Sequence, residues 1–495
     1  MKKTLALLCA LLLMLACALP AAGLAEETAK TPKYVFMFIG DGMGNPQVTA
    51  TQYYEGAIDN PDAAVPTPAD LSFTQFGNLG LMTTYDSTSF CPDSASTATA
   101  MASGQKTLSG VINYNVDKTG SFKLITEYAK EAGKKVGVIS SVSINHATPA
   151  AYYAKVESRN SYYDIAVQGL TGTTLDFIGG GGFHHPNGDD SKNDPQQNIY
   201  EVAAANGWTF ANTNEEIRAL NGESGRVVAV NPVLQDSDAM TYEIDRVRRV
   251  AAGEDILSLA DFVTAGINVL DNDDGFFMMC EGGKIDWSCH ANDAATSIAE
   301  TVAFSDAVQV ALDFAAGHPD ETLIIVTADH ETGGMTIGYA TTAYDTHFDY
   351  LANQTISFTD FNDVIDGLRD DKASFEDALA AVREYYGLTT EEGQALTLTE
   401  EDVASLKAAY ELSMLSSGQR TLTDEDKLAY GGYEPLSMAV SHIENNKAGL
   451  SYTSYSHTGL QVPVYAQGVG AENFNGLYDN TAIFQNTLAA MGLSQ

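Results

Sequence analysis

The chain has 495 residues, of which 44% are hydrophobic and 18% are charged, a composition that is typical of folded globular proteins and excludes a largely disordered chain. Asp and Glu number 65 against 26 Lys and Arg, which gives a formal net charge of −39. No run of Lys or Arg is long enough to offset this acidity locally, so nucleic acid is not expected as a partner, because its phosphates would be repelled.

The first 25 residues differ in composition from the rest of the chain. Two lysines precede an apolar run from residue 5 to 19, and small residues follow up to Ala25. This pattern predicts a secretory signal peptide over 1–25, and a mature chain that begins near Glu26 and is secreted or periplasmic. A lipoprotein is the alternative, because residues 14–17 resemble a degenerate lipobox. No later stretch is long and apolar enough to predict a transmembrane segment.

Four short apolar segments predict buried parallel strands, because they are rich in β-branched and aromatic residues and are bounded by turn signals. These segments are Tyr34–Ile39, Lys135–Ser140, Gly275–Cys280 and Thr322–Thr327. Helical patterns lie between them, for example over residues 122–132 and 294–315. Strands that alternate with helices indicate an α/β fold, here a three-layer α/β/α sandwich around a central, mostly parallel sheet.

Residues 340–450 interrupt this alternation with additional helical patterns. Ser374 begins one of these helices with a capping box, Gly387 ends it, and Thr399 begins another helix. We therefore expect residues 26–495 to form a single domain with an inserted helical segment at about 340–450.

Each predicted strand is followed by side chains that are suited to binding a ligand. In open α/β sheets, ligands bind outside the carboxyl ends of the strands, so these side chains are expected at one edge of the sheet. Carboxylates that gather there need a cation, since like charges at close range are unfavourable. Asp with His suits zinc, whereas Asp and Glu with a Thr hydroxyl suit magnesium. The acidic and histidine side chains at the strand ends are Asp41, Glu281, Asp286, His290, Asp329 and His330.

A helix of small residues is predicted to begin at Ser94, directly after Pro92 and Asp93. From this segment alone, a helix-capping serine is the simpler interpretation. Beside a metal cluster, however, we expect Ser94 to be a nucleophile whose oxyanion form is favoured by the helix dipole and by a metal.

Three cysteines follow the predicted signal peptide: Cys91, Cys280 and Cys289. All three are expected to be buried and to act as small apolar side chains. A disulfide between Cys280 and Cys289 is the alternative.

Five motifs, taken in chain order, resemble those of the alkaline phosphatases. They are the Asp-Gly-Met-Gly loop at Asp41, the Pro-Asp-Ser-Ala-Ser segment at Ser94, the Glu-Gly-Gly-Lys-Ile-Asp run from Glu281, the Thr-Ala-Asp-His run ending at His330, and the His-Thr-Gly loop at His457. The match extends from Tyr34 to the C-terminus, apart from the helical insertion, which is longer than the resemblance implies.

The resemblance implies a role for each matching residue. Ser94 is similar to the nucleophile that becomes transiently phosphorylated, and Arg159 to the arginine that binds phosphate. One Zn²⁺ would be held by Asp286, His290 and His457, and a second by Asp41, Asp329 and His330, with Ser94 as a further contact. A third metal, usually Mg²⁺, would share Asp41 and be completed by Thr148 and Glu281.

Two positions depart from the best-known bacterial type. That type has Asp and Lys where this chain has His146 and Trp287. His146 could therefore bring Zn²⁺ rather than Mg²⁺ to the third site, or hold a water on the metal there.

The resemblance thus implies an exported, metal-dependent alkaline phosphatase that hydrolyses phosphate monoesters and releases inorganic phosphate. A phosphodiesterase or a sulfatase on the same scaffold is the enzymatic alternative, although the segment before Ser94 lacks the sulfatase pattern and Arg159 suits two unesterified oxygens. A non-catalytic, acidic metal-binding protein is the alternative from another class. The family is commonly dimeric, so a homodimer is among the expectations.

Overall fold

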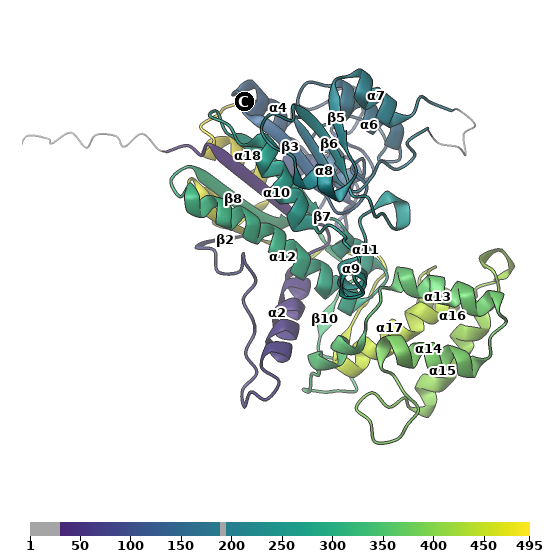
Figure 1. Ribbon diagram of the computed structural model, residues 1–495. Helices are drawn as coiled ribbons and strands as arrows, with labels where there is room; N and C mark the ends of the chain where they lie inside the picture. Colours follow the sequence, from purple (N-terminus) through teal and green to yellow (C-terminus); the bar gives the residue numbers. More distant parts are fainter. Residues whose placement is uncertain (1–29, 189–194) are drawn as a thin grey trace, which may run out of the picture.

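A ten-stranded sheet forms the centre of the protein, and helices pack around it (Figure 1). The computed structural model describes residues 30–188 and 195–495, so the predicted signal peptide lies outside the described residues. The strand order is β14-β2-β13-β8-β1-β7-β3-β4-β6-β5, and only β13 runs antiparallel to its neighbours. The predicted α/β class with a mostly parallel central sheet is therefore confirmed.

The four predicted strands are adjacent at the middle of this sheet. They are β8 (Thr322–Ala328), β1 (Tyr34–Gly40), β7 (Phe276–Gly282) and β3 (Lys135–Ser140), and they pair in parallel in that order. Nearly every residue in them is buried, which explains why their sequences are continuously apolar instead of alternating. Because Gly40 pairs with both Gly282 and Ala328, the strands end at the same level and deliver the following residues to one edge.

The remaining strands extend the sheet on both sides of this centre. One side carries β4 (Phe177–Gly180), β6 (Arg226–Val230) and β5 (Trp208–Ala211), and the other carries β13 (Val462–Gly468), β2 (Asn78–Thr83) and β14 (Gly476–Asp479). The helices of this part of the chain are α2 (Asn45–Asp59), α3 (Ser94–Ser103), α4 (Ile125–Glu131), α5 (Ala147–Ala150), α6 (Tyr162–Thr171), α7 (Ile199–Ala205), α8 (Asn214–Arg218), α9 (Glu243–Ala251), α10 (Leu259–Leu270), α11 (Lys284–His290), α12 (Ala294–Gly317) and α18 (Thr481–Ala490).

Two helices test the sequence-based boundaries. The helix predicted over 294–315 is α12, which continues for two more residues. The helix predicted over 122–132 begins only at Ile125, because the backbone N–H of Phe122 donates to Asn113 O and keeps that residue outside the helix. No helix among the described residues is long and apolar enough to cross a bilayer.

Five further helices lie to one side of the sheet (Figure 1). They are α13 (Phe358–Asp370), α14 (Phe375–Tyr386), α15 (Glu400–Ser413), α16 (Asp424–Tyr430) and α17 (Pro435–Ala448), and we refer to them together as the helical insertion. Capping boxes at Ser374 and Thr399 begin α14 and α15 as predicted. The helices surround a hydrophobic cluster of their own, which Ala291 joins from the region just after α11.

The cysteine predictions hold for two of the three side chains. Cys280 and Cys289 are buried and free, so the alternative disulfide between them is wrong. Cys91 is exposed rather than buried, because the chain crosses the surface before α3, where its neighbour Phe90 is also 82% exposed.

Glu444 of α17 predicts a measurable pH dependence of stability. Its side chain is fully buried, and neither carboxylate oxygen has a hydrogen-bond partner among the described residues. Burial, followed by the nearby Asp293, raises the pKa of Glu444 well above its usual 4.5. The folded state therefore binds this proton more tightly than the unfolded chain, and stability falls as the pH rises above the unfolded value.

Glu444→Gln is expected to stabilise the metal-free protein by about 1–3 kcal/mol at pH 8 and to change little at pH 5. Chemical unfolding at the two pH values measures this difference. Glu434→Gln is the matched control in the insertion, because that carboxylate pairs with Arg369 and Arg420 and its neutralisation is expected to destabilise the protein. An unchanged pH slope in Glu444→Gln would contradict the prediction.

Candidate active site

The predicted site residues converge at the carboxyl ends of the four central strands. Asp41 follows β1, Glu281 lies near the end of β7, and Asp329 and His330 follow β8. A short helix, α11, carries Asp286 and His290, and the small strand β12 (His457–Thr458), which pairs with β9 (Glu331–Thr332), brings His457 beside them. Asp41, Glu281, Asp329 and His330 are fully buried, so their charges have little access to water.

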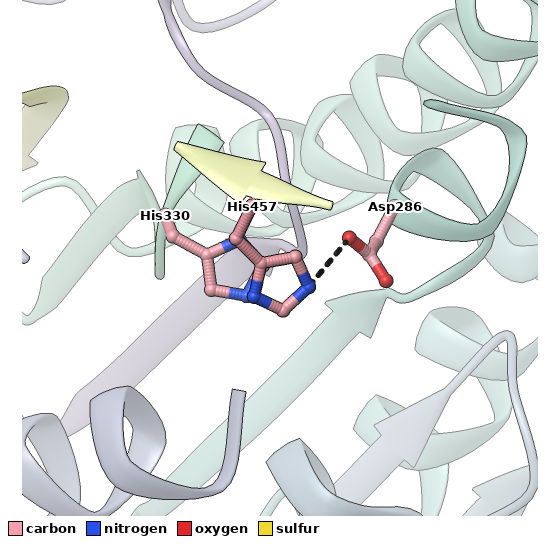
Figure 2. Close-up of side chains that lie close together, drawn as sticks. All are labelled: Asp286, His330 and His457. Carbon is pink, nitrogen blue, oxygen red and sulfur yellow. Dashed lines mark ion pairs between the residues drawn. The ribbon is translucent and has the colours of Figure 1, made fainter. Parts of the chain in front are cut away.

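A first group of side chains that could bind a metal surrounds Asp286. Ligand atoms of Asp286, His330 and His457 all lie within 4.8 Å of one another, and Figure 2 shows the carboxylate facing the two stacked imidazole rings. His290 completes this group, with Nε2 3.3 Å from Asp286 Oδ2 and 3.0 Å from His457 Nε2. The four-residue spacing of Asp286 and His290 places both on one side of α11.

Backbone carbonyls orient the two outer histidines of this group. His290 Nδ1 lies 2.6 Å from Tyr455 O, and His457 Nδ1 lies 2.6 Å from Pro92 O. A carbonyl oxygen only accepts, so each Nδ1 must carry a proton and donate it. Each Nε2 points at Asp286 and is the ring nitrogen that would bind a metal after losing its proton.

A second group lies next to the first and shares His330. His330 Nε2 is 3.4 Å from Asp41 Oδ1 and 3.2 Å from Asp329 Oδ2, and the ligand atoms of these three residues lie within 4.8 Å of one another. Ser94 Oγ is 3.3 Å from the same His330 nitrogen. Asp329 is itself held by the Gly42 N–H, at 3.1 Å from Oδ1.

Ser94 is not the capping residue of its helix. Asp93 is the N-cap of α3 and accepts a hydrogen bond from the Ser96 N–H, at 3.0 Å from Oδ1. Ser94 is the first helical residue, and its hydroxyl turns toward His330 instead of toward the helix. The capping interpretation of Ser94 is therefore wrong, and its hydroxyl remains available at the positive end of the helix dipole.

A third group forms on the other side of Asp41. Ligand atoms of Asp41, His146 and Glu281 lie within 4.8 Å of one another, and Thr148 Oγ1 donates to Asp41 Oδ2 at 3.2 Å. Asp41 Oδ1, Glu281 Oε1 and His146 Nδ1 are buried without a hydrogen-bond partner among the described residues. Asp41 belongs to both the second and the third group, which places it between two candidate cation sites.

The electrostatics of the three groups fit divalent cations. Burial, followed by the neighbouring carboxylates, raises the pKa of Asp41 well above 3.8, that of Asp329 to about 6 and that of Glu281 to about 8. Burial disfavours the charged form of His290, but Asp286 outweighs it and raises the pKa to about 9. Buried carboxylates with orphaned oxygens repel one another and are stabilised by metal ions.

Arg159 lies beside both the nucleophile segment and the third group. Its Nη1 is 2.9 Å from Asp93 Oδ2, and its Nη2 is 3.2 Å from His146 Nε2. His146 in turn packs edge-on against Trp287, with ring centroids 5.6 Å apart. The guanidinium is thus fixed at two points, and one of them, Asp93, directly precedes Ser94. A planar guanidinium in this position suits two phosphate oxygens.

Several residues that hold the site were not predicted. Thr332 Oγ1 donates to Asp286, Ser140 Oγ donates to Glu281, and Thr97 Oγ1 donates to Asp329 Oδ2 at 3.2 Å. Thr332 and Thr97 lie two and three residues after His330 and Ser94, so their places in those motifs were the available signal.

Comparisons with known proteins give consistent matches. Residues 32–493 match the family model described as alkaline phosphatase. Alkaline phosphatase 4 of Bacillus subtilis is 32% identical over 460 residues, which cover 90% of this chain and 86% of that protein. Alkaline phosphatase 3 of the same organism is 31% identical over 470 residues, which cover 93% of this chain and 89% of that protein.

Solved structures with the same fold extend these matches. The cold-active alkaline phosphatase of the psychrophile Shewanella sp. has a TM-score of 0.74 at 26% identity, over 92% of this chain and 99% of that chain. The alkaline phosphatase of the Antarctic bacterium TAB5 has a TM-score of 0.62 at 26% identity, over 94% of this chain and 100% of that chain.

Proposed function

This chain belongs to the alkaline phosphatase family, and from that premise we propose that it is an exported phosphomonoesterase that works through a phosphoserine at Ser94. The observation that carries this proposal is the position of Ser94 Oγ, 3.3 Å from His330 Nε2 and at the first residue of α3. A nucleophilic hydroxyl beside a cluster of metal ligands and next to a fixed arginine suits phosphoryl transfer.

We assign the three groups to three metal ions. His330 lies in both of the first two groups, and we assign it to the second. The first group then has two histidines and one carboxylate, and the second has two carboxylates and one histidine, and both sets suit zinc. Carboxylates with a Thr hydroxyl suit magnesium at the third group, unless His146 favours zinc there. When bound, the metals would favour the Ser94 alkoxide and neutralise charge on the leaving-group oxygen. The assigned ligands are Asp286, His290 and His457 for the first, Asp41, Asp329, His330 and Ser94 for the second, and Asp41, Thr148 and Glu281, with His146, for the third.

The residues of the chain then divide the reaction between them. Ser94 Oγ attacks phosphorus, and the bond to the ester oxygen breaks as the new Oγ–P bond forms. The alcohol leaves, and its oxygen takes up a proton in place of the one that Ser94 loses. Arg159, held by Asp93 and His146, binds two of the equatorial oxygens in both steps. Water then displaces Ser94 from phosphorus, which releases inorganic phosphate and restores the hydroxyl.

His146 predicts the metal preference of the third site. A variant of the TAB5 alkaline phosphatase in which one histidine is replaced by aspartate carries magnesium in its M3 site. An oxygen ligand suits Mg²⁺ better than an imidazole does, so His146→Asp is expected to raise Mg²⁺ affinity roughly tenfold. Activity titrated with Mg²⁺ at buffered zinc measures this change. His184→Asp, a substitution outside the three groups, is the control, and an equal response in both variants would contradict the role of His146.

The pattern over 1–25 supports export and a mature chain of 26–495. The position of the five insertion helices to one side of the sheet (Figure 1) supports one catalytic unit with an insertion at about 340–450. N-terminal sequencing of the protein recovered from an expressing bacterium tests the first point. A start near Glu26 is expected, a lipid-modified Cys17 would identify a lipoprotein, and an intact Met1 would argue against export.

Hydrolysis assays test the proposed activity directly. p-Nitrophenyl phosphate is expected to be hydrolysed far faster than bis(p-nitrophenyl) phosphate or p-nitrophenyl sulfate, with zinc and magnesium added, and EDTA is expected to abolish the activity. Dominant hydrolysis of the bis ester or the sulfate ester would overturn the substrate class. Bound metals without any hydrolysis would favour a binding protein instead.

A further inference from the structure

Tyr455 contacts a candidate metal ligand with its backbone and the helical insertion with its side chain. Its carbonyl oxygen lies 2.6 Å from His290 Nδ1 and holds the imidazole in the orientation that directs Nε2 to Asp286. The His290 side chain is 24% exposed, so packing alone does not fix its ring. His330, by contrast, is fully buried and enclosed by the strand ends.

The side chain of Tyr455 is held by the end of α16. Its hydroxyl donates to Ala429 O at 2.5 Å, one of the last carbonyls of the helix, which have no partner within the helix. The ring lies directly against Gly431, where an added Cβ would be only 2.4 Å from the ring Cγ. Gly431 also has a φ of +64°, so this close approach and this turn both require glycine. The rings of Tyr433 and His442 lie 6.2 and 6.0 Å from the Tyr455 ring.

The insertion also holds the other side of His290, through Asn292. Asn292 Nδ2 donates to Ser454 O at 2.9 Å, which ties the turn after α11 to the segment that carries Tyr455. Two residues of α17 contact Asn292 in turn: His442 Nε2 lies 3.2 Å from its Oδ1, and Asn445 Nδ2 donates to its carbonyl at 2.7 Å. Both sides of His290 are therefore connected to the insertion (Figure 1). Helix α16 holds Tyr455, whose carbonyl faces the His290 ring, and α17 holds Asn292, which lies two residues after His290.

We propose that the helical insertion positions His290 for metal binding, with Tyr455 as the positioning residue. This inference rests on the proposed function, because it requires a metal at Asp286, His290 and His457. Without the tether from its hydroxyl to α16, the Tyr455 carbonyl can move away from His290 Nδ1, and the partly exposed imidazole can then rotate. The first metal is then held less firmly, whereas the second, which uses the enclosed His330, is unaffected.

Tyr455→Phe tests this proposal because it removes the hydroxyl and keeps the ring against Gly431. Zinc release into an excess of chelator is followed over time for the fully loaded enzyme. One of the release phases is expected to become roughly tenfold faster, since the loss of groups that orient a metal ligand weakens metal binding by about 10–100-fold. Gly431→Ala, which forces the ring from its place, is expected to accelerate the same phase.

Tyr410→Phe is the matched control. Tyr410 lies in the insertion, and its hydroxyl, like that of Tyr455, donates to a backbone carbonyl, Ala373 O, at 2.6 Å. Unlike Tyr455, neither Tyr410 nor Ala373 is hydrogen-bonded to a candidate metal ligand among the described residues. Both Tyr→Phe variants are expected to lose similar stability, and only Tyr455→Phe to release zinc faster. Release rates that are equal in the two variants and in the wild type would overturn the positioning role alone. A wild-type protein that binds no zinc would overturn the proposed function as well.

Discussion

Replacing Ser94 with alanine is expected to lower kcat/KM for p-nitrophenyl phosphate by roughly 10³-fold or more. The hydroxyl is the group that would bond to phosphorus. The other two hydroxyls in the first turn of α3 have partners in the fold: Ser96 Oγ donates to Asp86 Oδ2 at 2.7 Å, and Thr97 Oγ1 donates to Asp93 O at 3.0 Å.

The metals are expected to stay bound in this variant, because Asp41, Asp329 and His330 still form the second group without Ser94. Complete loss is not expected, because Arg159 and the metals would still stabilise the phosphoryl group during direct attack by water. Steady-state kinetics with metal analysis on the same samples measures both quantities.

Ser103→Ala is the matched control for Ser94→Ala. Ser103 ends the same helix, is buried, and donates from its hydroxyl to Thr99 O at 2.7 Å. Its replacement is expected to leave kcat/KM unchanged. Acid-quenched wild-type protein incubated with labelled phosphate is expected to carry label on Ser94, and the Ser94→Ala protein to carry none. Label on Ser94→Ala, or retained activity, would remove Ser94 from the mechanism.

The centre of the fold could be predicted because its strands are buried on both faces. The runs Tyr34–Ile39 and Thr322–Thr327 are continuously apolar, and each differs from the observed strand by a single residue. Parallel pairing then brings the residues that follow to one edge, so the grouping of Asp41, Glu281 and Asp329 follows from topology. This part of the site is encoded locally, by strands and by the residues that directly follow them.

The contacts between distant segments could not be predicted in the same way. The carbonyl of Tyr455 reaches His290 across 165 residues, and no periodicity or motif announces a backbone hydrogen bond to a ring. Likewise, the exposure of Cys91 depends on how its loop crosses the surface, which composition does not reveal. The candidate metal ligands were therefore accessible from the sequence, whereas the groups that orient them required the folded chain.

Asp41→Asn is expected to change activity and metal-free stability in opposite directions. Asp41 contributes to the second and the third group of ligands, and the amide loses the charge that both cations need. Metal content is expected to fall by about two ions per chain, and kcat/KM by roughly 10³-fold or more. Metal analysis by mass spectrometry and kinetics with p-nitrophenyl phosphate measure these losses.

The metal-free protein is expected to respond in the opposite way. Asp41 is fully buried, its Oδ1 has no hydrogen-bond partner among the described residues, and burial and neighbouring carboxylates raise its pKa well above 3.8. Its ionised form therefore destabilises the empty site at pH 8, and Asn is expected to stabilise the metal-free protein by about 1–3 kcal/mol. With metals added, the wild type is expected to be the more stable, because only it binds them fully.

Asp245→Asn separates this effect from the neutralisation of any buried aspartate. Asp245 is equally buried, but its oxygens accept from Ser357, at 3.0 Å from the backbone N–H, and from Gln235 Nε2, also at 3.0 Å. Its replacement is expected to destabilise the protein with and without metals and to leave the metal content unchanged. If Asp41→Asn instead destabilised the metal-free protein in the same way, the Asp41 carboxylate would be held by the fold itself. The ionised Asp41 carboxylate would then not destabilise the metal-free protein, and metal binding would not relieve an unfavourable charge there.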